Sequence, residues 1–115
     1  MEGINNPESF EDFKNRVREV FERDGLTESL SAEIKDWCER RFMETSPQEV
    51  RDEEKIESRM QKAEICGIVE KYDLSWVFLD TAWDIAYYAN LLGLKDKVED
   101  LMDKIHSKKD GEELP

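Results

Sequence analysis

The sequence has few of the residues from which small catalytic and metal sites are usually built. Its only histidine is His106, close to the C-terminus, and its two cysteines, Cys38 and Cys66, stand far apart among apolar residues. No Cys/His spacing typical of a metal site occurs, and the five glycines form no phosphate-binding loop. We therefore expect no catalytic residue, no cofactor and no metal ligand. We interpret the cysteines as buried free thiols, with a disulfide or a metal role as the alternative.

Long apolar runs and basic residues are also scarce. The longest apolar run, residues 85–89, is far too short to span a membrane. Lysine and arginine number 17 against 29 acidic residues, so the formal net charge is −12. A surface of that charge repels phosphate groups, which argues against nucleic acid and anionic lipid as direct partners. The first residues lack the basic and apolar parts of a signal peptide, so we expect a cytoplasmic location.

The chain does contain enough apolar residues for a core, and they are unevenly distributed. Charged residues make up 40% of the 115 residues, against roughly a quarter in an ordinary globular chain. Two of the three tryptophans and all three tyrosines fall within residues 65–94. A core built around this segment is large enough to fold without a metal or a disulfide. We expect one helical domain over 1–106 and a flexible C-terminal tail over 107–115.

Apolar residues recur every three or four positions along five segments, which is the period of an amphipathic helix. The first segment begins either at Asn6-Pro7, because proline is favoured at the first helical position, or at Ser9, which with Asp12 forms a capping pattern, and it ends at Gly25. The pattern predicts an all-α fold, a compact bundle of four to five helices. The segment at about 74–92 is nearly all apolar, so we expect it to be the central helix, ended by Gly93. The apolar stripe of the second segment consists of Leu30, Ile34, Trp37, Cys38 and Phe42.

This central helix retains two acidic residues, Asp80 and Asp84, and no basic residue lies between Leu74 and Leu94. Because they are four residues apart, the two carboxylates lie on one face of a helix. Carboxylates form charge-assisted hydrogen bonds, and aromatic rings bind cations and anchor protein interfaces. The pair either marks the solvated edge of a buried helix or belongs to a recognition face. The candidate partner-binding face consists of Trp76, Asp80, Asp84, Tyr87 and Tyr88.

A second group of acids, Glu53, Glu54 and Glu57, spells E-E-x-x-E and precedes Asp80 by about one helix length. These segments together resemble the all-α NTP pyrophosphohydrolases of the MazG type, which carry E-E-x-x-E on one helix and E-x-x-D on the next. Asp80 matches the final Asp, whereas Val77 stands where the second motif has Glu. The resemblance implies an enzyme that uses magnesium to hydrolyse nucleoside triphosphates, in a degenerate form.

The function that the sequence favours is a small acidic, non-catalytic protein-interaction module. It would bind a basic or amphipathic protein partner, or associate with a second copy of itself, and Glu53, Glu54 and Glu57 would form an accessory acidic patch. The alternatives are the degenerate MazG-like hydrolase and an acidic nucleic-acid mimic that inhibits a nucleic-acid-binding protein. Exposure of Asp80 and Asp84 beside aromatic residues would favour the interface. Their convergence with the three glutamates would favour the magnesium enzyme.

Overall fold

A computed structural model describes residues 8–45 and 47–110, and within these ranges the chain forms α-helices and no β-strand. The prediction of an all-α bundle is therefore confirmed. None of these helices combines the length and the apolar character that a bilayer span requires, over the residues that the structure describes. The five helices are α1 (Phe10–Asp24), α2 (Glu28–Thr45), α3 (Asp52–Ile68), α4 (Tyr72–Tyr88) and α5 (Leu92–Asp110).

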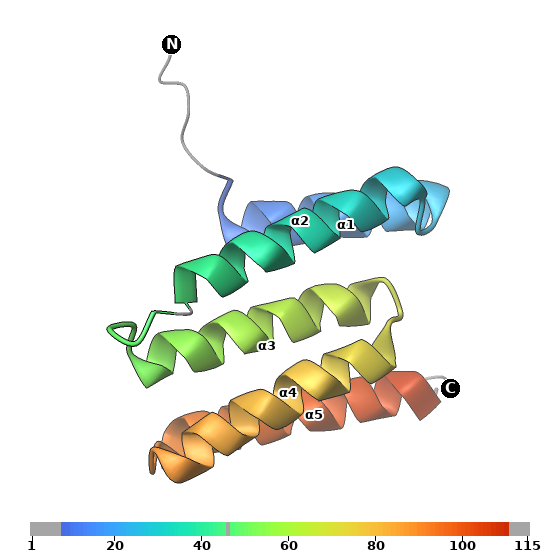
Figure 1. The fold of residues 1–115 in the computed structure, drawn as a ribbon. Helices are drawn as coiled ribbons and strands as arrows, with labels where there is room; N and C mark the ends of the chain where they lie inside the picture. The colour runs from blue at the N-terminus through green and yellow to red at the C-terminus, as the bar shows by residue number, and fades with distance from the viewer. Residues whose placement is uncertain (1–7, 46, 111–115) are drawn as a thin grey trace.

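The helices form a flat assembly in which α3 is shared by two helical hairpins. The α1–α2 hairpin lies on one side of α3 and the α4–α5 hairpin on the other (Figure 1). The molecule measures 46 × 40 × 19 Å along its principal axes. Between the described parts of the two hairpins, no Cα atoms approach within 8 Å, whereas α3 contacts all four other helices. Almost everything that joins the two hairpins therefore passes through α3.

The prediction that the helix over 74–92 is the central one is wrong. The helix α4 packs against α3 and α5 only, and α3 occupies the centre. The apolar character of α4 has another cause, because several of its large apolar residues, among them Leu74 and Val77, are exposed. The high apolar content of α4 therefore reflects apolar residues exposed on its surface, and not burial among the other helices.

Two separate clusters of buried residues make up the core, one on each side of α3. In the first, the Trp37 ring of α2 stacks on Phe13 of α1, with 5.2 Å between the ring centroids. The second cluster, between α3, α4 and α5, is built around Ile56, Leu79 and Val98. The small size of each cluster follows from the thin shape of the molecule.

The most extensive helix contact is between α3 and α4, and small residues line it. Ala63 and Ser75 are fully buried there, and the Ser75 hydroxyl donates a hydrogen bond of 2.8 Å to the Ala63 carbonyl oxygen. At Gly67, a Cβ atom would lie 2.7 Å from the end of the Ile105 side chain of α5, so a larger residue would require that side chain to move. Small residues thus allow three helices to meet closely at this point.

Left-handed residues end two of the helices. Glu70 follows α3 with φ of 65°, and Asn90 follows α4 with φ of 62°. In each case the next residue donates a backbone hydrogen bond back into the helix, from Lys71 to Cys66 and from Leu91 to Ala86. The prediction that the helix over 74–92 ends at Gly93 is therefore wrong. Asn90 follows the end of α4, and Gly93 lies inside α5.

The C-terminal helix extends past the predicted domain boundary. Residues 107–110, which we assigned to the tail, belong to α5, which ends at Asp110. The remaining residues of the predicted tail, 111–115, lie outside the described residues.

Candidate functional site

The five residues of the predicted partner-binding face are brought onto the outer surface of α4, but they divide between its two flanks. Trp76 is half-buried on the α5 flank, where its ring lies edge-on to His106 with 6.5 Å between centroids. Tyr87 is half-exposed on the same flank and stacks on Trp83, whose indole N–H donates to Glu99 at 2.8 Å. These aromatic rings therefore take part in the α4–α5 contact.

The two aspartates of the predicted face are exposed to solvent. Asp80 follows Trp76 by one helical turn, on the α5 flank of α4. Asp84 lies beside Tyr88, which is 82% exposed, in a shallow hollow that also includes Asp52 of α3. Exposure of both acids beside aromatic residues is the arrangement that favours an interface over a metal site.

The glutamates of the E-E-x-x-E motif lie away from Asp80. Glu53, Glu54 and Glu57 line a groove on α3 together with Arg51 and with Lys97 of α5. A hydrogen bond from its own backbone and the nearby Arg51 side chain hold the pKa of Glu53 below its ordinary value. In the described ranges, no three Asp, Glu, His or Cys side chains come together in a way that could hold a metal ion. The convergence that a MazG-like site requires is not found there.

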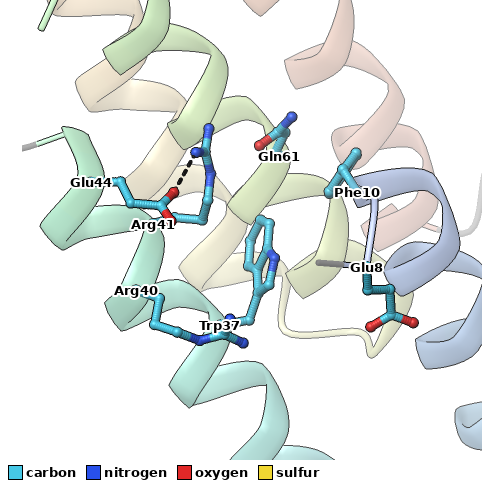
Figure 2. A pocket seen from close by; sticks show the side chains of 7 residues that line it. All are labelled: Glu8, Phe10, Trp37, Arg40, Arg41, Glu44 and Gln61. Atoms are coloured by element: carbon cyan, nitrogen blue, oxygen red, sulfur yellow. Dashed lines mark hydrogen bonds and ion pairs between the residues drawn. The ribbon is translucent and has the colours of Figure 1, made fainter. Parts of the chain in front are cut away.

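A small polar pocket opens beside Trp37, between α1, α2 and α3 (Figure 2). It has a volume of about 390 Å³, and its basic side chains come from Arg40 and Arg41 of α2. Arg40 pairs with Asp36 at 3.1 Å, and Arg41 pairs with Glu44 at 2.8 Å. Because these cations already have counter-ions, the pocket is a weak candidate for an anionic ligand.

A groove with a mainly apolar lining lies between α2 and α4, and we call it the α2–α4 groove. It has a volume of about 450 Å³. Its walls come from α2 and α4, and its floor comes from α3. The lining residues are Lys35, Cys38, Glu39, Phe42 and Met43 of α2, Lys62 of α3 and Phe78 of α4.

Packing explains why this groove exists. Both α2 and α4 pack on α3 without approaching each other, so a strip of α3 between them is left without a helix above it. On the α2 wall, Phe42 is 55% exposed and Met43 is 72% exposed. On α4, Leu74 is exposed one turn before Phe78 and therefore extends the same apolar side. Our sequence prediction placed Phe42 in the buried stripe of its helix and missed the groove.

The floor of the groove is a buried lysine. Lys62 is only 4% exposed, and its Nζ atom lies 5.5 Å from the Phe42 ring centroid and 5.6 Å from that of Phe78. Burial lowers the pKa of Lys62; the Cys38 thiol opposes this shift, and the nearby Arg59 and Arg41 side chains add to it. Within the described residues, no carboxylate forms an ion pair with Lys62. An apolar groove with a cation at its base is the result.

The thiol in the groove is not an activated nucleophile. Burial raises the pKa of Cys38, and burial raises the pKa of Cys66 on α3 to about 12. A thiol whose pKa is raised is protonated near neutral pH and reacts slowly. Both thiols are free; Cys66 is buried and Cys38 is half-buried. The groove is therefore better suited to binding than to covalent chemistry.

Comparisons of the chain with protein-family models, with curated proteins and with solved structures return no match. The fold defines the class of protein, a flat five-helix all-α domain with an open groove over its central helix.

Proposed function

We propose that this protein is a small acidic, non-catalytic interaction module of the cytoplasm, whose α2–α4 groove receives an amphipathic helix of a protein partner. The observation that carries the proposal is an open apolar groove between two helices on a chain that is 40% charged. Contiguous exposed apolar surface on such a chain is typical of an interaction site. Free thiols at Cys38 and Cys66 agree with a reducing compartment.

The shape of the groove supports a helix as its occupant. The helices α2, α3 and α4 run side by side (Figure 1), so a further helix could lie above α3 along the same direction. Helices that bind in this way place apolar residues at i, i+3 or i+4 and i+7 into a groove. Phe42, Met43 and Phe78 offer flexible and aromatic surface for such anchors, and Met in particular adapts to differently shaped partners.

Charge supports a partner whose outer face is basic. The net charge of −12 attracts a basic molecule at long range and raises the rate of association. Glu39 on the rim of the groove is exposed and could contact basic residues of the bound helix. An amphipathic helix with basic residues on its polar side would satisfy both the groove and its surroundings.

The experiment that tests this function compares two surfaces of the same protein. We expect a pull-down with wild-type bait to capture a partner that Met43→Asp bait does not capture, because a charge in the groove prevents burial of an apolar helix. The double variant Asp80→Ala/Asp84→Ala should capture as much partner as wild type. Circular dichroism should show that both baits fold, since all three positions are exposed.

A photo-crosslinking amino acid at Met43 locates the contact directly. It should crosslink to the captured partner, and the same amino acid at Glu19, which is exposed on α1, should not. Capture that survives Met43→Asp but is lost with Asp80→Ala/Asp84→Ala would show that the partner binds the α4 acids and not the groove.

A further inference from the structure

Several basic side chains gather near Lys62 at the base of the α2–α4 groove, although the chain as a whole is acidic. Around the Lys62 ammonium group are the Cys38 thiol and the side chains of Arg41 and Arg59. Arg41 is already paired with Glu44, and Arg59 donates to the Lys55 carbonyl oxygen at 3.1 Å. The Lys62 ammonium group lies over the faces of the Phe42 and Phe78 rings, and among the described residues no ion pair joins it to a carboxylate.

A buried ammonium group without a carboxylate is unfavourable for folding. Contact with aromatic rings recovers part of the lost hydration, but less than an ion pair with hydrogen bonds would. A methionine at position 62 would fill a similar volume between Phe42 and Phe78 and would not need to be desolvated as a cation. The cation therefore has no evident role within the chain itself, and it lines a groove open to an outside ligand.

We propose that the helix bound in the α2–α4 groove carries one carboxylate, from Asp or Glu, in the middle of its apolar face, and that this carboxylate pairs with Lys62. This inference rests on the proposed function and specifies the chemistry of the partner. The partner helix then has two kinds of polar group: basic residues on its outer side and a single acid among its apolar anchors.

Pairing with Lys62 would make the groove selective. A helix with the acid forms a charge-assisted hydrogen bond in a site shielded from water, where such bonds are strong. A purely apolar helix would cover Lys62 and leave the ammonium group without water or a counter-ion, which strongly disfavours the complex. Lys62 thus rejects the apolar helices that the walls of the groove would otherwise accept.

A displayed peptide library tests this selectivity without knowledge of the natural partner. Each peptide is about 20 residues long, so that it can form a helix, and carries apolar residues along one face with a single central position of that face randomised. We expect selection on the wild-type protein to enrich Asp or Glu at this position. Selection on Lys62→Met should enrich apolar residues, and Lys35→Met, which removes an exposed lysine of the rim, should keep the acidic preference.

Binding constants for a selected peptide give the magnitude. Replacement of its central Glu by Gln should weaken binding to wild type by at least about thirtyfold, because the change leaves one buried charge unpaired. The same replacement should have little effect on binding to Lys62→Met. If Lys62→Met does not fold, Lys62→Gln serves as the second variant, since it keeps a polar side chain without the charge.

The outcomes separate the two proposals. Peptides that bind the groove, as judged by loss of binding with Met43→Asp, but show no acidic preference would overturn this inference alone. Failure to recover any peptide whose binding depends on Met43 would contradict the proposed function as well. A dimer of the protein itself that Lys62→Met dissociates, measured by sedimentation equilibrium, would assign the groove to a second copy and overturn the proposal of a separate partner helix.

Discussion

On the α1–α2 side of α3 the core is built around one large ring, whereas on the α4–α5 side small residues bring the helices together. Trp37 lies between Phe10 and Phe13 on the first side, with centroid distances of 5.7 and 5.2 Å. On the second side, Ala63 and Ala82 are fully buried and α3 packs most extensively against α4. Large residues hold their helices apart, and small residues let them approach.

The two sides also differ in their ion pairs. Arg16 of α1 pairs with Glu33 of α2 and with Glu8 at 2.9 Å, and Lys14 pairs with Glu64 of α3 at 3.2 Å. The Arg16–Glu33 pair joins α1 to α2, and the Lys14–Glu64 pair joins α1 to α3. On the α4–α5 side, Lys95 and Glu99 form an ion pair of 3.0 Å between neighbouring turns of α5.

The difference in packing between the two sides of α3 explains where the α2–α4 groove lies. On one wall the spacing of the helices is set by large side chains, and on the other wall α4 is drawn close to α3. No helix therefore lies above the strip of α3 between them, where Lys62 is covered by the Phe42 and Phe78 side chains. Four changes would test this contrast, taken from the largest expected effect to the smallest.

Trp37→Ala should remove the centre of the first core cluster. We expect the free energy of unfolding to fall by about 3–5 kcal/mol, as for other buried aromatic residues, and urea denaturation would measure it. Met43→Ala on the same helix is the matched control, because Met43 is largely exposed; its effect should stay within about 0.5 kcal/mol. Equal effects at the two positions would show that α2 is not held by the Trp37 ring.

Ala82→Leu tests the second side in the opposite direction, by enlarging a residue. Ala82 is fully buried on α4, so the extra atoms should force the helices apart and lower the free energy of unfolding by about 1–3 kcal/mol. The neighbouring Thr81 is exposed, and Thr81→Leu should change stability by less than about 0.5 kcal/mol. A stabilised Ala82→Leu protein would mean that the contact has unfilled space.

Lys62→Met should stabilise the protein by about 1 kcal/mol near neutral pH, because it removes a buried charge that no carboxylate compensates. The pKa of Lys62 is lower in the folded than in the unfolded chain, so between these two pKa values the unfolded chain binds more protons. The stability of the wild type therefore gains from this residue as pH rises toward about 10, and the advantage of Met should shrink.

Urea unfolding at pH 7 and at about pH 10 measures this change. The groups that face Lys62, which are Cys38 and Arg41 of α2 and Arg59 of α3, are the same in both proteins. Lys35→Met, at an exposed lysine of the rim, should show no such pH-dependent difference from wild type. A constant difference between Lys62→Met and wild type at both pH values would contradict a shifted pKa at Lys62.

Glu70→Gly should raise stability by about 0.5–1 kcal/mol, because glycine adopts the left-handed conformation after α3 without the steric conflict of a side chain. Asn90→Gly, at the equivalent position after α4, should gain only a few tenths, since asparagine already tolerates this conformation. Thermal melts of the two variants provide the comparison. A larger gain at Asn90 than at Glu70 would contradict it.

Local features of the fold could be predicted from the sequence because neighbouring residues decide them. The Asp12 backbone N–H donates to the Ser9 hydroxyl at 3.1 Å, as the capping pattern predicts, and Gly25 ends α1 with φ of 77°. The end of α4 was missed because Asn90, rather than Gly93, adopts the left-handed conformation. Glycine and asparagine both tolerate this conformation, so residue type alone did not distinguish the two positions.

The candidate site was less predictable for a different reason. Phe42 follows Trp37 and Cys38 at helical spacing, and nothing in the periodicity distinguishes a residue that is buried from one that is left on the rim of a groove. Lys62 gave a weak signal, as a charge among the apolar residues of α3, but its burial depends on Phe42 and Phe78, which belong to helices on either side.

By itself, the sequence determined that this chain is helical, that α1 ends at Gly25, and that its surface is acidic. Those properties depend on capping residues, on apolar period and on composition, which are local or additive. Only the tertiary structure decided that α3 rather than α4 is central and that a lysine lies at the base of an open groove. Periodicity records which side of a helix is apolar, whereas the packing of the other helices decides whether anything covers that side.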